Sequence, residues 1–205
     1  MLRRLLLLTW FGLSMCLPLA ARADGTILIY GDSLSAAYGL SQDAGWPALL
    51  QARLKREGMD YTVTNASISG ETTSGGAARI AEVLKTHKPR VIVVELGAND
   101  GLRGLPPGQM RANLAKIITR SLRARARVLL VGMRMPPNYG PSYTREFAQV
   151  YISLASEYKT ALAPFLFEGM EQRRELFQAD NLHPTAAAQP ILMENIWKAL
   201  VPLLK

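Results

Sequence analysis

The chain is poor in the side chains on which several enzyme classes depend. Its 205 residues include one cysteine, Cys16, and two histidines, His87 and His183. No His, Cys and carboxylate group has the spacing of a metal site, and no G-x-G-x-x-G follows the first strand pattern. G-x-S-x-G is also missing. The sequence therefore gives no support for a metal site, a dinucleotide site or the nucleophile turn of ordinary α/β-hydrolases.

The first 23 residues have the pattern of a secretory signal peptide. Arg3 and Arg4 precede an apolar run at 5–20. Ala21-Arg22-Ala23 has the small side chains of a cleavage site. The run is shorter than the roughly 20 residues of a membrane-spanning helix. We therefore expect cleavage after Ala23 and a periplasmic or secreted domain of residues 24–205, which N-terminal sequencing of the exported chain would test. That domain would have no cysteine, because Cys16 lies in the leader.

Basic side chains outnumber acidic ones, with a formal net charge of +8. Three arginines lie in the leader, so its removal lowers the charge to +5. Much of the remaining excess is at Arg120, Arg123, Arg125 and Arg127, which we interpret as a solvated helix end. Peripheral contact with an anionic membrane surface is the alternative. Nucleic acid is not an expected partner, because no aromatic residues or known motif accompany the basic residues. The sequence does not indicate an oligomeric state.

Strand and helix patterns alternate along the rest of the chain. Apolar and β-branched runs predict strands at 26–30, 61–65, 90–96, 127–131 and 161–164. Apolar residues at helical spacing predict helices at 45–56, 74–86, 106–125, 143–159 and 183–204. The longest loops, 97–106, 133–141 and 165–181, follow strand ends. This order predicts a single-domain three-layer α/β/α sandwich with a five-stranded parallel sheet.

Four short polar segments lie at or just beyond predicted strand ends: 31–35, 65–72, 97–100 and 180–184. Ligands in such folds bind at the carboxyl ends of the strands, and Ser33 is placed there as a nucleophile. A serine nucleophile needs a base with a pKa near 7. His183 fits this role better than His87, which ends a helix among lysines. Asp180, three residues before His183, can orient and stabilise the imidazole.

A serine nucleophile also needs donors for the oxyanion of its tetrahedral intermediate. The backbone N–H of Ser33, the N–H of Gly70 and the side-chain amide of Asn99 are the candidates. Taken alone, Gly70 could be an ordinary turn glycine and Asn99 an Asx-turn residue. The case for an oxyanion site depends on all three donors lying at the same predicted edge of the sheet as Ser33.

Together these segments resemble the GDSL/SGNH hydrolase superfamily, whose fold is flavodoxin-like. Ser33, Gly70, Asn99 and His183 match its namesake residues, and Asp180 completes the triad. Residues 65–70, 95–104 and 137–140 are similar to the bacterial periplasmic multifunctional acyl-CoA thioesterase I/arylesterase/lysophospholipase subfamily. Two departures, Glu71 and Ala98, stand where that subfamily often has Asp and Gly. Neither removes a proposed catalytic atom.

The resemblance implies a serine hydrolase of esters and thioesters that uses no cofactor and no metal. Its expected substrates are acyl-CoA-type thioesters, aryl esters and lysophospholipids. It also implies substrate contacts from Arg103, Leu105, Asn138 and Tyr139. Asp32 is expected to form the turn beside Ser33, and Glu95 to belong to a buried structural network. A polysaccharide or cell-wall O-acetyl esterase with the same residues is the first alternative, and a non-enzymatic lipid- or glycan-binding module is the second.

Overall fold

The computed structural model describes residues 25–205, so the predicted signal peptide and its cleavage site lie outside the described residues. Five parallel strands form the central sheet, in the order β2-β1-β3-β4-β5. Their bounds are β1 Gly25–Gly31, β2 Tyr61–Asn65, β3 Val91–Glu95, β4 Arg127–Val131 and β5 Ala161–Ala163. The prediction of a five-stranded parallel sheet is confirmed.

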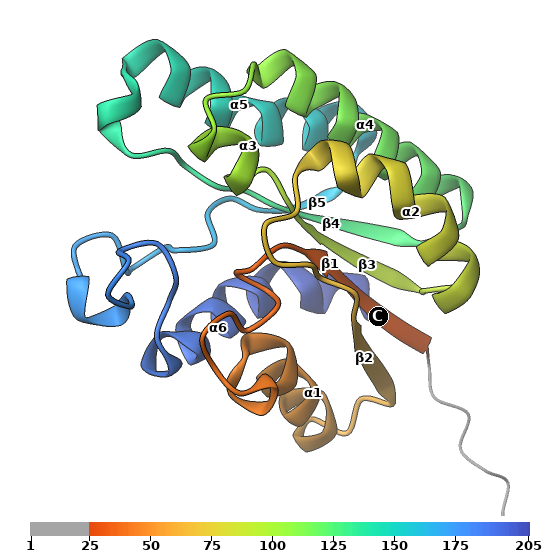
Figure 1. Cartoon of the computed structure of the whole chain (residues 1–205). Coiled ribbons are helices and arrows are strands. Elements are labelled where there is room, and N and C mark those ends of the chain that lie inside the picture. The colour runs from red at the N-terminus through yellow and green to blue at the C-terminus, as the bar shows by residue number, and fades with distance from the viewer. Residues whose placement is uncertain (1–24) are drawn as a thin grey trace, which may run out of the picture.

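Helices cover both faces of this sheet (Figure 1). On one face lie α1 and α6, and on the other lie α2, α4 and α5. Their bounds are α1 Trp46–Arg56, α2 Thr73–His87, α4 Pro107–Arg123, α5 Pro141–Tyr158 and α6 Gln189–Leu200. Because both faces are covered, every residue of the β3 sequence VIVVE is buried, which explains why this strand is an unbroken apolar run apart from Glu95.

The strand order positions the site. The chain leaves β1 toward β2 on one side, whereas β3 lies on the other side of β1 and leads away toward β4. Such a reversal opens a crevice at the carboxyl ends of the two central strands. The loops after β1 and β3 therefore meet there, and the segment after β2 joins them through the Ile68 N–H, which donates to the Gly31 carbonyl at 3.0 Å.

Two predictions of secondary structure were wrong. The last helix begins at Gln189 and not at His183, and a 3₁₀ turn at Ala186–Ala188 precedes it. Pro190 occupies the first turn of α6, where its missing N–H costs nothing. Residues before that turn are extended, since the Thr185 N–H donates to the Leu176 carbonyl at 2.8 Å.

The second error concerns the segment after β3. The predicted loop at 97–106 contains a short helix, α3, at Ala98–Leu102. Its single turn is too short to show a helical period in the sequence. The other predicted helices and strands are present, with ends that shift by one or two residues. Within residues 25–205, no helix combines the length and the hydropathy needed to cross a bilayer.

Candidate active site

Ser33, His183 and Asp180 form one hydrogen-bonded chain. The hydroxyl oxygen of Ser33 lies 2.9 Å from Nε2 of His183, and Nδ1 of His183 lies 2.7 Å from Oδ2 of Asp180. With the Nδ1 proton directed at the carboxylate, Nε2 is left to accept the proton of the serine hydroxyl. The structure thus brings together three residues that are up to 150 positions apart in the sequence.

A tight turn holds Asp180 in place. Its Oδ1 accepts hydrogen bonds from the backbone N–H groups of Leu182, at 2.9 Å, and His183, at 3.0 Å. Asn181 adopts a left-handed conformation, with φ +61°, which asparagine tolerates better than most residues. The hydrogen bond from the His183 side chain, with these backbone bonds, lowers the pKa of Asp180 below its usual range. Asp180 therefore remains an ionised acceptor for His183.

The turn that carries Ser33 depends on close contacts at the end of β1. A Cβ on Gly31 would lie 2.7 Å from Oε2 of Glu95 and 2.8 Å from Oγ of Ser35. Glu95 is fully buried, and its Oε2 accepts hydrogen bonds from the Ser35 hydroxyl at 2.7 Å and the Asp32 N–H at 3.4 Å. The expected network around Glu95 is therefore present, and it supports the turn that carries Ser33.

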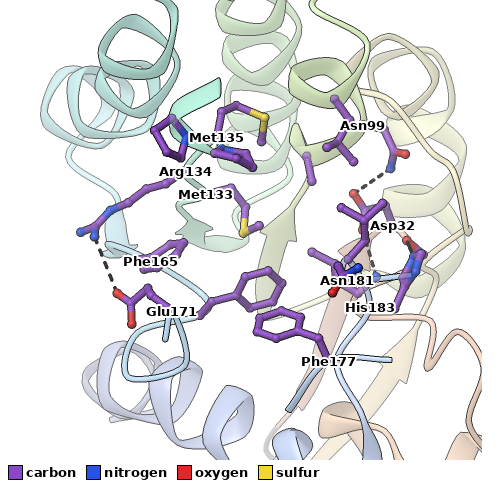
Figure 2. A pocket seen from close by; sticks show the side chains of 18 of the residues that line it. Asp32, Asn99, Met133, Arg134, Met135, Phe165, Glu171, Phe177, Asn181 and His183 are labelled. Carbon is purple, nitrogen blue, oxygen red and sulfur yellow. Dashed lines mark hydrogen bonds and ion pairs between the residues drawn. The ribbon is translucent and has the colours of Figure 1, made fainter. Parts of the chain in front are cut away.

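Asp32 does more than form the turn. Its Oδ1 accepts the Leu34 N–H at 3.0 Å, as expected, but its Oδ2 also accepts the Asn99 amide at 3.0 Å (Figure 2). Burial raises the pKa of Asp32 to about 6, against the lowering effect of these hydrogen bonds. Burial and the nearby Asp32 raise the pKa of Glu95 well above its usual range. Two buried carboxyl groups, Asp32 and Glu95, therefore lie in and below the turn of Ser33.

This pair should make stability depend on pH. Suppose that the pKa of a carboxyl group is higher in the folded than in the unfolded protein. Its contribution to the stability of the fold is then complete below the unfolded pKa and is lost as pH rises toward the folded pKa. For Glu95 the loss begins near its ordinary value of 4.5. We therefore expect the Tm of Glu95→Gln, measured relative to the parent chain, to increase as pH is raised from about 4 to 8. A Tm difference that stays constant over this range would contradict the raised pKa.

Of the three candidate oxyanion donors, one is the N–H of Ser33 itself, and Asn99 lines the same cavity as Ser33. Within residues 25–205, neither the Ser33 N–H nor the Gly70 N–H donates a hydrogen bond to another group of the protein. Gly70 has φ +79°, which favours glycine at this position. The Asn99 amide nitrogen donates to Asp32 Oδ2 and, at 3.1 Å, to the Glu71 carbonyl. Both of its hydrogens are therefore engaged, while the two backbone donors are free.

An apolar cavity of about 520 Å³ opens beside Ser33 and His183. It extends from these residues toward Arg134 and Glu171, whose side chains lie 4.0 Å apart at its far end (Figure 2). Side chains from the loops after several strands form its wall: Leu34, Leu102, Met133, Met135, Phe165, Phe167, Phe177 and Leu182. The volume and the lining are those of a small-molecule site.

The four residues predicted to contact substrate do not line this cavity. Arg103 donates to the Gly70 carbonyl at 3.3 Å, and the Leu105 carbonyl accepts the Tyr143 hydroxyl at 2.8 Å. Asn138 is exposed, and the Tyr139 hydroxyl donates to the Leu102 carbonyl at 3.0 Å. Their role in substrate binding stays a prediction. The residues that do line the cavity were missed because they are ordinary apolar residues from separate loops.

The remaining candidates lie apart from Ser33. His87 ends α2 just before β3 begins, at the opposite edge of the sheet. Arg120 and Arg123 are in the last turn of α4, and Arg127 begins β4, so these arginines are also at that opposite edge. Contact of this surface with a membrane stays a prediction. The described part of the chain contains no cluster of three or more His, Cys, Asp or Glu side chains suited to a metal ion.

The Ser33 hydroxyl is hydrogen-bonded to a histidine–aspartate pair and lies beside an apolar cavity. This arrangement is typical of a serine acyl hydrolase. Comparison with known proteins agrees. Residues 29–190 match the model of the GDSL-like lipase/acylhydrolase family. The chain therefore belongs to this family, and it is an acyl hydrolase.

Individual relatives cover nearly the whole chain. Esterase TesA of Pseudomonas aeruginosa is 50% identical over 196 residues, which span 94% of this chain and 98% of that protein. Thioesterase 1/protease 1/lysophospholipase L1 of Escherichia coli K12 is 44% identical over 184 residues, or 90% and 86% of the two chains. The crystal structure of TesA matches with a TM-score of 0.85 at 52% identity, covering 87% of this chain and 99% of that one.

Proposed function

We propose that this protein hydrolyses carboxylic esters and thioesters of medium or long acyl chains through an acyl-enzyme on Ser33. The observation that carries the proposal is the hydrogen-bonded chain from Ser33 through His183 to Asp180 at the mouth of an apolar cavity. Relatives named as esterase, thioesterase and lysophospholipase support this substrate class.

In the first half of the reaction, Ser33 Oγ attacks the acyl carbon while His183 Nε2 takes the hydroxyl proton. Asp180, which stays ionised, holds the imidazole by its Nδ1–H and stabilises the imidazolium that forms. The C–O or C–S bond to the leaving group then breaks, and His183 returns its proton to the departing atom. Water attacks the acyl-enzyme by the same path, again with His183 as base, and releases the acid.

The negative charge that develops on the acyl oxygen needs hydrogen-bond donors already in place. We assign this role to the N–H groups of Ser33 and Gly70, which donate to no other group among residues 25–205. Asn99 would join them by redirecting one amide hydrogen from Asp32 or from the Glu71 carbonyl to the substrate. Asp32 thus positions Asn99 beside the nucleophile.

The volume and the apolar lining of the cavity favour acyl chains longer than acetyl. Its wall is largely made of apolar side chains, including Leu34, Met133 and Phe177, and an acetyl group would leave most of the space unfilled. Burial of each CH₂ group contributes about 0.8 kcal/mol. A chain that follows this wall therefore gains binding energy with each added carbon until it reaches the polar end at Arg134 and Glu171.

A series of p-nitrophenyl esters from acetyl to palmitoyl tests this substrate class, run beside acyl-CoA and lysophosphatidylcholine. We expect kcat/KM to rise about fourfold per CH₂ over the first few carbons beyond acetyl, the rate equivalent of that burial energy. Turnover of acetyl esters with none of octanoyl or longer esters would favour the O-acetyl esterase instead. Binding of these ligands without any hydrolysis would favour the non-enzymatic module.

A further inference from the structure

Tyr38 lies against the imidazole ring of His183. The two ring centroids are 4.3 Å apart, with 33° between the ring planes. Tyr38 does not line the acyl cavity, so its ring approaches His183 from another side. It is also 51% exposed, although it is a large aromatic side chain. The rest of its ring is therefore open to a molecule that approaches His183 from outside the cavity.

The backbone around Tyr38 fixes this position. Ala37 and Gly39, on either side of it, both have left-handed conformations, with φ +57° and +73°. The Gln178 side-chain amide donates to the Tyr38 carbonyl at 2.9 Å and to the Pro184 carbonyl at 3.0 Å. These two hydrogen bonds link the loop of Tyr38 to the loop of His183. A Cβ on Gly39 would lie 2.4 Å from Gln178 Oε1, so glycine is needed for this close approach.

The mechanism determines which part of the substrate meets this ring. The tetrahedral carbon bears Ser33 Oγ, the oxyanion, the acyl chain and the leaving atom. The acyl chain occupies the cavity, and the oxyanion faces the donors at Ser33 and Gly70. The leaving atom must reach His183 Nε2 to receive its proton. The leaving group therefore lies beside His183 and outside the cavity, where the exposed part of Tyr38 is.

Two other exposed apolar side chains belong to segments that adjoin Ser33 and His183, and one of them, Leu182, also lines the acyl cavity. Ile68 is 50% exposed and Leu182 is 43% exposed. Leu182 directly precedes His183, and the Ile68 N–H donates to the Gly31 carbonyl two residues before Ser33. Exposed apolar side chains that gather around a reacting centre are typical of a surface that binds an apolar group. Together with Tyr38, these segments favour a leaving group that is itself apolar.

We propose that Tyr38 forms a leaving-group subsite for flat, apolar alcohols and thiols, aryl groups above all. The inference rests on the proposed function, since it assigns the leaving-group side of the same reaction. An aryl group in this subsite stacks on the exposed part of the Tyr38 ring. As the C–O bond breaks, its electron pair stays on the leaving oxygen, and His183 donates its proton to that oxygen. The aryl alcohol then leaves from its position beside the Tyr38 ring.

Three butyrate esters that differ only in the leaving group test the subsite: ethyl, phenyl and 2-naphthyl. kcat/KM includes the departure of this group, so it is measured for the parent chain, Tyr38→Ser and Tyr38→Phe. An aromatic contact corresponds to a rate factor of about 5. We expect Tyr38→Ser to lower kcat/KM for the 2-naphthyl ester about fivefold more than for the ethyl ester. Tyr38→Phe keeps the parental ratio.

Ile152→Ser is the matched control, because Ile152 is equally exposed, at 50%, but lies on α5 far along the chain from the site. It should leave all three rates unchanged. An equal loss for the three esters in Tyr38→Ser would overturn the proposal, because it would show that Tyr38 only supports His183. Unchanged rates would overturn it as well. Failure of the proposed function is a separate result, in which the parent chain hydrolyses none of the esters.

Discussion

Replacing Ser33 with alanine is expected to lower kcat/KM for p-nitrophenyl octanoate by about 10⁴-fold or more. The variant loses the atom that attacks the acyl carbon, while the oxyanion donors and the acyl cavity remain. Little else should change, because the Ser33 side chain bonds only to His183 among the described residues. Initial rates, with circular dichroism spectra to confirm the fold, measure this effect.

Ser69→Ala is the matched control for this loss. Ser69 is an exposed serine next to Gly70, at the same edge of the sheet, and it has no histidine partner among residues 25–205. Its removal should change kcat/KM less than about twofold, as is usual for exposed side chains outside a site. Comparable losses in both variants would mean that the chemistry does not depend on Ser33.

Replacing Asp180 with asparagine is expected to lower kcat by about 10³-fold with little change in KM. The amide keeps the size of the side chain but lacks the charge that stabilises the imidazolium. It also no longer enforces the tautomer in which Nδ1 carries the proton and Nε2 accepts it. The cavity that binds the acyl chain is unaffected, so the loss should be confined to the chemical steps.

Glu175→Gln serves as the control for Asp180→Asn. Glu175 is an exposed acid in the same long segment before His183, where it pairs with Arg173 at 3.0 Å. Its removal should leave kcat within about twofold of the parent. If Asp180→Asn kept the parental kcat, the orienting role of Asp180 would be refuted, even though its distance to His183 is 2.7 Å.

The sequence predicted the sheet and the triad for physical reasons. A parallel strand covered on both faces is apolar along most of its length, so β1, β3 and β4 could be recognised from their apolar runs. The half-buried β2 was recognised instead from its alternating pattern. The polar segments after these strands then had to share one edge of the sheet. With two histidines in the chain, only His183 followed an acid at a spacing suited to a tight turn. The structure places Asp180, His183 and Ser33 in contact as that reasoning predicted.

Other features of the site depend on contacts that no local pattern encodes. Phe165, Phe177 and Met133 lie on separate loops, and each looks like an ordinary core residue until the fold brings it to the cavity. The ring contact of Tyr38 with His183 likewise joins residues 145 positions apart. The Gln178 side-chain amide supports it by donating a hydrogen bond to the Tyr38 carbonyl. Burial, which the sequence does not give directly, is also what raises the pKa of Asp32 and sets it apart from an ordinary turn residue.

The most direct test of the central claim is to react the protein with a fluorophosphonate and locate the adduct by peptide mass spectrometry. The proposed mechanism predicts one adduct per chain, on the peptide that contains Ser33, because His183 activates this hydroxyl. It also predicts that octanoate esters slow the labelling by competing for the cavity. No label on the parent chain, or a label that persists in Ser33→Ala, would contradict the assignment of Ser33 as the nucleophile.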